Sequence, residues 1–330
     1  MKIVIPTAGF GTRLRPHTWS KPKPLVSVAG KPVLGHVLDM FRTVPDVDEV
    51  VFIIGYLGEQ IEEYVSEAYP DLPTRYVVQE QMLGQSHAIW LAREGLEGPM
   101  LMAFVDTLID VDLSFLADTE VDAIAWVKEV EDPRRFGVAD LNEQGRVERL
   151  VEKPEDLSNN LAVVGFYYFK EAKELLSAIE KQIDSGDKLK GEFYLADAIN
   201  YMLNEGLEMR VETVDVWEDC GKPEPLLKTN RYLLDHGRDN SDEAQREGSV
   251  IVPPVSIHPS AELINAVVGP HASIGADCKI ERASIRNSIV EDRTSITDAQ
   301  LEGSVIGRDV TITGADQKLN VGDNSDVTLS

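Results

Sequence analysis

A glycine loop followed by a run of cations is the stretch of this sequence best suited to chemistry. Lys2–Pro6 has the pattern of a short buried strand, and the small-residue loop Thr7–Pro16 follows it directly. Glycines let backbone amides approach a ligand, and successive amides in a turn form a nest for anions. No acidic residue precedes Asp39, although the chain has a net charge of −25, and five cations gather here: Arg13, Arg15, Lys21, Lys23 and Lys31. The sequence therefore predicts an anion site, and the alternative is a solvated basic turn.

Three motifs occur in order along this segment: Gly9–Pro16, Pro22–Leu25 and Lys31–Pro32. Together they resemble the signature of the sugar-1-phosphate nucleotidylyltransferases. Other phosphate loops fit less well, because a dinucleotide fingerprint needs glycine where Leu14 stands and a Walker loop needs Gly-Lys-Ser/Thr, which the sequence lacks. The resemblance implies that a sugar 1-phosphate attacks the α-phosphorus of a nucleoside triphosphate, so that pyrophosphate leaves and a nucleotide sugar forms.

The resemblance assigns the nucleotide to the N-terminal loop and to one further strand end. Arg13 is expected to bind the departing pyrophosphate, since a guanidinium binds phosphate oxygens two at a time, and Lys23 to meet the α-phosphate or the sugar phosphate. Gln79 is expected to recognise a pyrimidine edge, because an amide offers both a donor and an acceptor. The remaining expected nucleotide contacts are Ala8, Gly9, Gly11, Thr12 and Gly84.

A second group of motifs resembles the sugar side of the family's site. Lys153, in Glu152-Lys153-Pro154, is expected to bind the sugar's phosphate, and Glu152 the sugar hydroxyls. Gly137 would let the sugar lie close. Tyr167 is equally well explained as a core residue or as a sugar contact, and Glu192 is expected to contact the sugar.

Two aspartates resemble the family's metal-binding elements. Asp106 follows a predicted buried strand, and Asp219 follows a later one. The resemblance implies that the two hold one Mg²⁺ against the triphosphate, which fits the one or two protein carboxylates that Mg²⁺ usually takes. Val105 stands where the family usually has glycine, and this departure bears on activity rather than on fold.

Predicted strands and helices alternate along this part of the chain, and the candidate site residues named above come at the ends of strands. Glu49–Ile54 is a continuous apolar run that ends before Gly55, as expected of a strand buried on both faces. Strand–helix–strand order predicts an α/β fold with a Rossmann-like, mostly parallel sheet. Ligands of such sheets bind beyond the carboxyl ends of the strands. The loop after Pro6, Gln79 and Asp106 all lie at predicted ends of this kind.

The last part of the chain has a different periodicity. Aliphatic residues recur every five or six positions between small or polar residues, as in Val267–Ile274, Ile289–Ile296 and Val305–Ile312. This pattern predicts a short parallel β-helix, and the stretch resembles the left-handed β-helix tail of the long form of glucose-1-phosphate thymidylyltransferase. We predict a catalytic domain over 1–232, a linker over 233–250 and the β-helix over 251–330. The β-helix is expected to organise a homo-oligomer without doing chemistry.

Composition excludes several other classes of protein. The two cysteines, Cys220 and Cys278, form neither a disulfide framework nor a zinc pattern and fit a cytoplasmic protein. No apolar run has the ~18 residues of a membrane span. The acidic chain is a poor partner for nucleic acid.

Three functional hypotheses remain at this point. The first is an active enzyme that uses dTTP or UTP, with glucose 1-phosphate as the expected acceptor. An enzyme specific for UTP, a uridylyltransferase, is an alternative within this hypothesis. The second is a catalytically silent relative that binds a sugar nucleotide and regulates a partner. The third is an acyltransferase working from the β-helix, for which only His258 and His271 are available as catalytic histidines.

Overall fold

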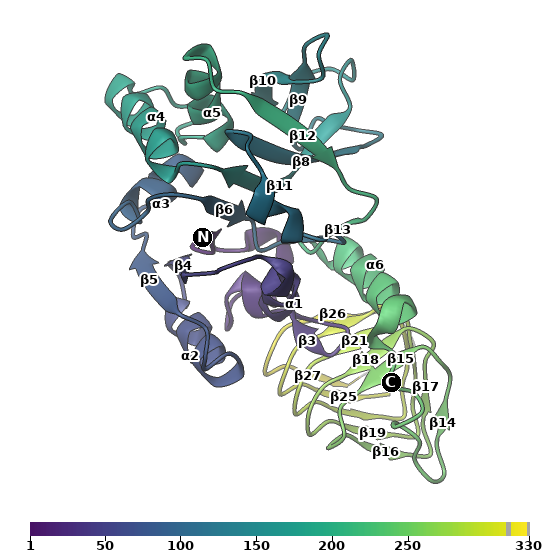
Figure 1. Cartoon of the computed structure of the whole chain (residues 1–330). Coiled ribbons are helices and arrows are strands. Elements are labelled where there is room, and N and C mark those ends of the chain that lie inside the picture. The colour runs from purple at the N-terminus through teal and green to yellow at the C-terminus, as the bar shows by residue number, and fades with distance from the viewer. Residues whose placement is uncertain (315–317, 329–330) are drawn as a thin grey trace. The chain divides into compact units, whose positions relative to one another are not determined.

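The computed structural model describes residues 1–314 and 318–328, and these divide into two compact units (Figure 1). Unit 1 comprises Met1–Gly9 and Val37–Trp217. Unit 2 comprises Phe10–His36 together with the described residues from Glu218 onward. Within the described ranges, no helix combines the length and the hydrophobicity that crossing a lipid bilayer requires.

Unit 1 is built on a nine-stranded mixed sheet with the strand order β10-β9-β11-β6-β1-β4-β5, in which β8 also pairs with β11 and with β12. The pairs of β1 with β4 and β6, of β4 with β5 and of β8 with β12 are parallel. The long strand β11 is antiparallel to its neighbours. The strands are β1 (Lys2–Pro6), β4 (Glu49–Ile54), β5 (Thr74–Val78), β6 (Met100–Ala103), β8 (Ala123–Glu129), β9 (Gly137–Leu141), β10 (Val147–Glu152), β11 (Leu161–Phe169) and β12 (Met209–Thr213).

Helices pack with this sheet into one hydrophobic core. Residues of α3, α4 and α5 share a buried cluster with β1, β6 and β8, as the amphipathic spacing of their apolar residues requires. The helices of unit 1 are α2 (Gly58–Ala68), α3 (Gln85–Leu91), α4 (Ala172–Ser185) and α5 (Leu195–Asn204), and α1 (Val33–Met40) contains the boundary between the units. The predicted Rossmann-like α/β sheet is confirmed.

Unit 2 contains the predicted left-handed parallel β-helix. Its first four coils have three short strands each, and the described residues of the last coil have two. The strands stack into parallel ladders that form three faces: β14-β17-β20-β23, β15-β18-β21-β24-β26 and β16-β19-β22-β25-β27. Aliphatic side chains such as Ile257, Ile274 and Val290 fill the interior. The strands are β14 (Val250–Ile251), β15 (Val255–Ile257), β16 (Glu262–Ile264), β17 (Val267–Val268), β18 (Ala272–Ile274), β19 (Lys279–Glu281), β20 (Ser284–Arg286), β21 (Ile289–Val290), β22 (Ser295–Thr297), β23 (Gln300–Glu302), β24 (Val305–Ile306), β25 (Thr311–Thr313), β26 (Asn320–Val321) and β27 (Asp326–Thr328).

The predicted linker over 233–250 is structured and belongs to the β-helix unit. It contains the short helix η5 (Leu234–Arg238), which continues α6 (Pro223–Leu233). The Asp239 carboxylate accepts the Val255 N–H at 2.9 Å, and the Asn240 side chain bonds the backbone of Ile257 in both directions. Ala244 lies in the β-helix core. These side chains cover the edge of the first coil, which a parallel ladder would otherwise leave unpaired.

The N-terminal segment Phe10–His36 is the other component of unit 2. It contains two short 3-10 helices, η1 (Thr12–Leu14) and η2 (Lys23–Leu25), and a hairpin of β2 (Ser27–Val28) and β3 (Lys31–Pro32). The predicted phosphate loop is thus divided at Gly9, although the sequence suggested a single domain over 1–232. The partition follows side-chain partners that lie far along the chain, which are described below.

Candidate active site

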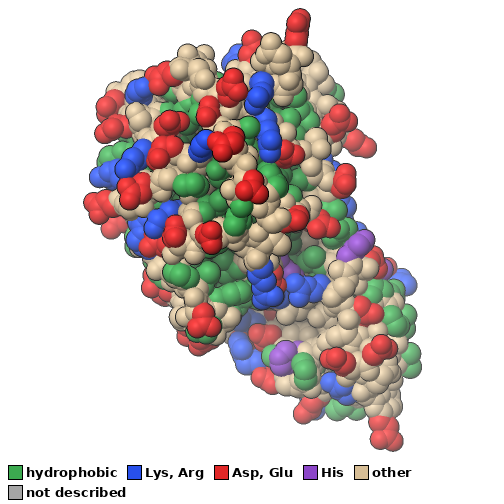
Figure 2. All heavy atoms as spheres, viewed as in Figure 1, with side chains coloured by type: hydrophobic (Ala, Val, Ile, Leu, Met, Phe, Trp, Pro, Cys, Tyr) green, Lys and Arg blue, Asp and Glu red, His purple; other side chains and the backbone are tan. Residues whose placement is uncertain are grey.

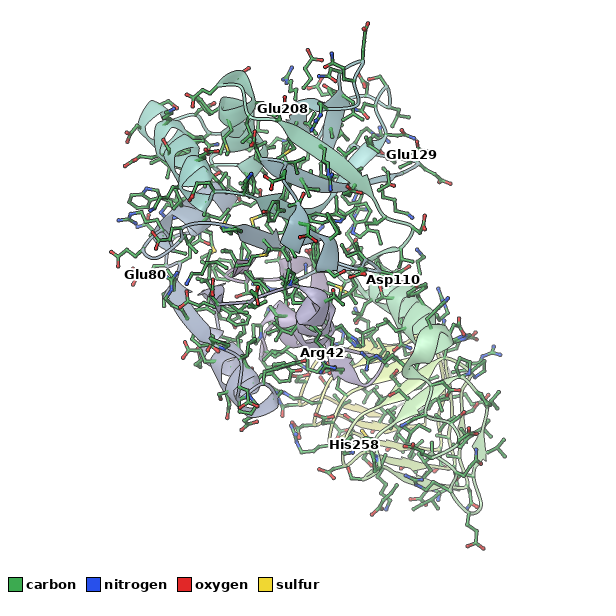
Figure 3. The ribbon with its side chains drawn as sticks, in the orientation of Figure 1. Arg42, Glu80, Asp110, Glu129, Glu208 and His258 are labelled. Carbon is green, nitrogen blue, oxygen red and sulfur yellow. The ribbon has the colours of Figure 1, made fainter. Side chains whose placement is uncertain are left out.

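In unit 1, the base-side candidates surround the carboxyl ends of β1, β4 and β5. Ala8 follows β1 and is buried against Gly55, where a Cβ on the glycine would lie 2.7 Å from the Ala8 carbonyl oxygen. Gln79 follows β5 and is also buried, and its backbone N–H donates to Ile54 at 2.8 Å. Figure 3 labels the next residue, Glu80, and so marks this strand end. Ala8 and Gln79 thus follow strands that lie on either side of β4 in the sheet of unit 1.

A histidine fixes the Gln79 side chain. Gln79 Nε2 donates to the Gly84 carbonyl at 3.2 Å and lies 3.2 Å from His87 Nδ1. Burial lowers the pKa of His87, and the nearby charge of Lys188 lowers it further. A neutral imidazole with Nδ1 unprotonated accepts the amide hydrogen. The sequence treated His87 only as a packing residue, but its place one turn into the helix after Gly84 was a usable signal.

Gly84 occupies a position that admits no side chain. It precedes α3 with φ at +106°, and a Cβ would lie 2.5 Å from the carbonyl oxygen and 2.6 Å from the nitrogen of Phe193. The Phe193 N–H donates to Leu83 at 2.8 Å, and its carbonyl accepts from Ser86 at 3.1 Å. Glu192, the residue before Phe193, is exposed and can reach a ligand. The base-side loop and the predicted sugar-side turn are therefore held together by the main chain.

The sugar-side lysine is held by a tyrosine and a glutamate. Lys153 Nζ donates to Tyr194 Oη at 3.0 Å and to Glu152 Oε1 at 3.1 Å, and it lies 4.5 Å from the Tyr194 ring centroid. Burial alone would lower the pKa of Lys153, but the Tyr194 hydrogen bond and the Glu152 charge outweigh it and raise the pKa. Lys153 therefore remains a cation at neutral pH. The sequence motifs do not single out Tyr194, although it lies two residues after the expected sugar contact Glu192.

Two further sugar-side candidates lie beside Glu152. Gly137 pairs with Glu152 across β9 and β10, and a Cβ on the glycine would lie 3.2 Å from Glu152 Oε2. Tyr167 is 6% exposed, belongs to the core and stacks on Phe169. Burial raises the pKa of Tyr167, and the charge of Glu152 adds to the effect. Tyr167 is therefore packed in the core, as one of the two interpretations of the sequence described, and its hydroxyl is influenced by the charge of Glu152.

Asp106 lies beyond the end of β6, in the turn before β7 (Thr107–Ile109). The strand ends at Ala103, earlier than the apolar pattern through Val105 predicted. Phe104 instead leaves the strand to fill the space above Gly165, where a Cβ would lie 2.7 Å from the Phe104 ring. Val105 is buried and Asp106 is half-buried. The Val105 side chain is therefore buried among the hydrophobic residues of unit 1.

In unit 2, Arg13 and Asp219 lie beside the same glycine. Gly221 donates its N–H to Asp219 Oδ1 at 2.6 Å. A Cβ on Gly221 would lie 2.7 Å from this oxygen and 3.3 Å from Arg13 Nη2. The glycine therefore leaves room for a carboxylate and a guanidinium to share one small space.

The other cations of the loop differ in their surroundings. Thr18 Oγ1 donates to the Gly11 carbonyl at 2.8 Å, and a Cβ on Gly11 would lie 2.9 Å from Lys23 Cβ. Gly11, Thr18 and Lys23 are thus packed together, while Thr12 and Arg13 are exposed. Arg15 lies over the Trp19 ring at 5.9 Å. Lys21, which the sequence counted among the anion-binding cations, is buried and paired with acidic residues of the β-helix, so we correct that expectation.

The donor set of the two aspartates is compatible with Mg²⁺. Among the residues that the structure describes, no cluster of three or more His, Cys, Asp or Glu side chains has metal-binding geometry. Mg²⁺ needs only one or two protein carboxylates, because phosphate oxygens and water complete its octahedron. One Asp219 oxygen is engaged by Gly221. Asp219 has a second carboxylate oxygen and Asp106 is half-buried, and the carboxylate oxygens of each residue, taken by itself, are the kind of hard ligand that this ion prefers.

Acidic side chains are scattered over the surface, and the two β-helix histidines bond to neighbouring side chains. Figure 2 shows Asp and Glu side chains scattered over the visible face of each unit. His258, labelled in Figure 3, bonds Ser260 Oγ through Nδ1 at 2.8 Å, and His271 bonds Asp235 through Nε2 at 2.9 Å. Both imidazoles therefore have partners within unit 2.

Known proteins resemble the chain over its whole length. The family described as nucleotidyl transferase matches residues 2–236. The low-salt glycan biosynthesis nucleotidyltransferase Agl11 of Haloferax volcanii is 33% identical, and a glucose-1-phosphate thymidylyltransferase of Streptomyces griseus is 30% identical, each with 100% of both chains covered. A solved UDP-glucose pyrophosphorylase in complex with UDP-glucose shares the fold over 71% of this chain and 98% of its own, with 23% identity and a TM-score of 0.61. The chain belongs to the nucleotidyl transferase family.

Proposed function

We propose that this chain transfers a nucleotidyl group from dTTP or UTP to glucose 1-phosphate, giving a nucleotide sugar and pyrophosphate. One observation carries the proposal within unit 1. Two consecutive residues join the two halves of the candidate site: the Phe193 backbone binds the base-side loop, and the Tyr194 hydroxyl holds Lys153. A base-recognising loop fixed to a phosphate-binding lysine is what a nucleotide–sugar product needs.

The roles in unit 1 follow from this arrangement. Gln79, whose amide nitrogen bonds the Gly84 carbonyl and His87, presents its side-chain oxygen as an acceptor for the N3–H of the pyrimidine, and Gly84 leaves room for the base. Lys153 binds the phosphate of the sugar, and Glu152 accepts hydrogen bonds from its hydroxyls. Gly137, Tyr167 and Glu192 complete the sugar contacts. Ala8 and Gly9 begin the backbone cradle of the triphosphate.

The roles in unit 2 concern charge. Gly11 and Thr12 offer backbone amides to the phosphates, and Arg13 binds the β- and γ-phosphates that leave as pyrophosphate. Lys23 neutralises the α-phosphate. Asp106 of unit 1 and Asp219 of unit 2 are each proposed as ligands of Mg²⁺. When bound, the ion neutralises charge on the phosphates of the substrate.

The chemistry asks the protein for positioning and for charge neutralisation. An oxygen of the sugar 1-phosphate forms a new bond to the α-phosphorus, and the bond from the α-phosphorus to the oxygen that bridges to the β-phosphate breaks. The negative charge that leaves on pyrophosphate is stabilised by Arg13. Phosphoryl-type transfers depend chiefly on such placement, so the mechanism requires no general base among the described histidines.

A matrix of substrates tests the proposal. dTTP, UTP, dCTP and ATP are each combined with glucose 1-phosphate, galactose 1-phosphate and N-acetylglucosamine 1-phosphate, and released pyrophosphate is measured. We expect release only with a pyrimidine triphosphate that carries a 4-oxo group together with a sugar 1-phosphate. Thymine differs from uracil by one methyl, worth ~1–3 kcal/mol in a pocket, so a preference of up to about a hundredfold between dTTP and UTP is expected.

The outcomes separate the hypotheses. Binding of a nucleotide sugar without pyrophosphate release from any pair would support a silent regulatory relative and contradict the proposal. Release with UTP alone would make the chain a uridylyltransferase. An acyl-coenzyme A arm with sugar-amine acceptors tests the third hypothesis, and the partners of His258 and His271 lead us to expect no transfer. We also propose a cytoplasmic homo-oligomer, which light scattering and cell fractionation would check.

A further inference from the structure

Residues 16–30 run along one face of the β-helix, coil by coil. Gly30 lies against Ser256 of β15, at a distance that leaves no room for a Cβ. Two coils further, Ser27 donates its N–H to Glu291 Oε1 at 3.0 Å. At the far end, a Cβ on Gly322 would lie 2.8 Å from Pro16 Cβ. The face consists of β15, β18, β21, β24 and β26, and Figure 1 shows β3 beside it. We call it the loop-binding face.

A buried ionic cluster extends along this face from the end of β21 to the end of β26. The Lys21 ammonium contacts Glu291 Oε2 and lies 3.7 Å from Asp323 Oδ1. The side chains of Lys21, Glu291 and Asp323 are 5%, 4% and 2% exposed. Burial lowers the pKa of Lys21 to about 8, and the charge of Asp323 opposes the shift. Charges removed from water to this degree are retained only where partners hold them, so the cluster defines one position for this part of the loop.

Two residues that precede Lys21, Ser20 and His17, make further contacts that fix the loop. Ser20 Oγ donates to Asp323, and the Ser20 carbonyl accepts from Arg308 Nη2 at 3.0 Å. Arg308 Nε in turn bonds Asp323 at 3.0 Å. His17 Nε2 lies 2.5 Å from Asn320 Oδ1, and the ring is 1% exposed. Asp323 therefore connects the loop to the last coils of the β-helix through two different side chains.

The anchored residues adjoin those that we propose to bind phosphate. Lys21 and Lys23 flank Pro22, and Pro24 follows, so little backbone freedom separates the buried ammonium from the proposed α-phosphate ligand. Thr18 lies between His17 and the Gly11 carbonyl that it binds. The path from Glu291 and Asp323 to Gly11 and Lys23 thus consists of short, packed links.

We propose that Glu291 and Asp323 are positioning residues for the reaction, which hold the phosphate-binding loop in its working geometry. The inference rests on the proposed function. The sequence led us to expect that the β-helix only organises a homo-oligomer. The proposal instead gives the β-helix a part in positioning the loop for catalysis. Truncation near Gly237 would remove every anchor named above and should abolish turnover.

The test uses the full chain with Glu291→Gln and Asp323→Asn, which keep side-chain size and remove charge. The control is Glu302→Gln, which loses an exposed carboxylate paired with Arg286 on another face. Hydrogen exchange of peptides covering residues 12–28 is measured beside peptides of β4, at a temperature where all variants are folded. We expect loop exchange to speed up about tenfold or more in both test variants, as loss of a charged hydrogen bond implies, and to stay unchanged in Glu302→Gln and in β4.

Kinetics provide the second readout. We expect kcat/KM for the nucleoside triphosphate to fall about tenfold in Glu291→Gln, whereas KM for the sugar 1-phosphate stays within about twofold, because Lys153 and Glu152 are held inside unit 1. A merely destabilised enzyme would lose activity with both substrates in proportion to its folded fraction.

Two results would overturn the proposal: unchanged exchange in residues 12–28, or faster exchange with unchanged kcat/KM for the triphosphate. A wild-type chain that releases no pyrophosphate would contradict the proposed function instead. In that case the exchange data would still decide whether Glu291 and Asp323 hold the loop.

Discussion

The two units hold their candidate residues by different means. In unit 1, Gly84 packs closely on the Phe193 backbone, and the hydroxyl of the next residue, Tyr194, binds Lys153. In unit 2, the loop that carries Arg13 and Lys23 is held by buried charges, with Lys21 between Glu291 and Asp323. We therefore expect the Gly84 loop of unit 1 to be disrupted chiefly by a change of side-chain size, and the Arg13–Lys23 loop of unit 2 by a change of charge.

This contrast follows from what each scaffold offers. A wide sheet brings strand ends and helix starts together, so backbone groups of distant segments meet directly, as in the bonds of Phe193 to Leu83 and Ser86. A β-helix satisfies its own backbone within the coil ladders and presents side chains outward. A loop that binds such a face must use side-chain partners.

The largest expected effect tests whether each unit contributes a metal ligand. We expect Asp106→Asn and Asp219→Asn each to lower kcat by about a hundredfold or more, since a metal supplies several kcal/mol of charge stabilisation. Pyrophosphate release is measured across a Mg²⁺ titration. Near-normal turnover and Mg²⁺ dependence in either variant would remove that residue from the proposed metal ligands.

The next effect tests the sugar side of unit 1. We expect Lys153→Ala to weaken sugar-phosphate use by up to about a hundredfold, as loss of a charged hydrogen bond of ~2–3 kcal/mol implies, with much less change in triphosphate binding. Initial rates and calorimetric titration of each ligand give the comparison. Lys170→Ala is the control, because Lys170 pairs with Glu120 at the surface. Equal weakening for both ligands would contradict the division of roles in unit 1.

A matched pair of glycines tests the claim that unit 1 depends on shape. Gly84 and Gly206 have φ values of +106° and +99°, but a Cβ meets Phe193 at the first and nothing within 4 Å at the second. Both alanine variants carry backbone strain of order 1 kcal/mol or more. We expect Gly84→Ala to lower the free energy of unfolding by roughly 2 kcal/mol beyond Gly206→Ala. Thermal unfolding measures the difference, and equal losses would show that the contact is unimportant.

The smallest effect tests the claim that buried charge matters in unit 2. Arg282 bonds Asp298 on the β-helix surface, where the two side chains are 48% and 51% exposed. We expect Arg282→Ala to leave the free energy of unfolding almost unchanged, because exposed pairs are screened by water. Breaking the buried Lys21–Glu291 pair in Glu291→Gln should cost ~3–5 kcal/mol. Denaturant unfolding compares them, and similar costs would remove the distinction.

Local patterns in the sequence predicted most of the fold. The continuous apolar run of β4 and the recurring aliphatic positions of the β-helix are both read within a few residues, because each depends on period and burial alone. The same holds for Gln79, which directly follows β5, whereas Asp106 lies three residues beyond the end of β6. Gly84 and Lys153 were found through motifs in which a specific residue type stands at a fixed spacing.

The rest depends on partners that no local pattern identifies. Lys21 and Glu291 are 270 positions apart, and His17 and Asn320 are 303 apart. With 57 acidic residues in the chain, nothing in the sequence marks Glu291 as the buried one. For this reason Lys21 was assigned to the anion site, and Phe10–His36 to the catalytic domain. Tyr194 was missed because a tyrosine in a turn has no preferred partner by type.

The loop-binding face also constrains how the length of this protein can change in evolution. Neighbouring coils repeat about every 16 residues, as between Arg282 and Asp298, and adjacent strands are about 4.7–4.9 Å apart. Residues 16–30 cross the coils and have a fixed length, and they contact Ser256 near one end and Asp323 near the other. Inserting or deleting one coil between those two residues would displace Asp323 by a full strand spacing and separate it from Ser20. Related chains that use this arrangement should therefore differ in coil number only outside residues 256–323.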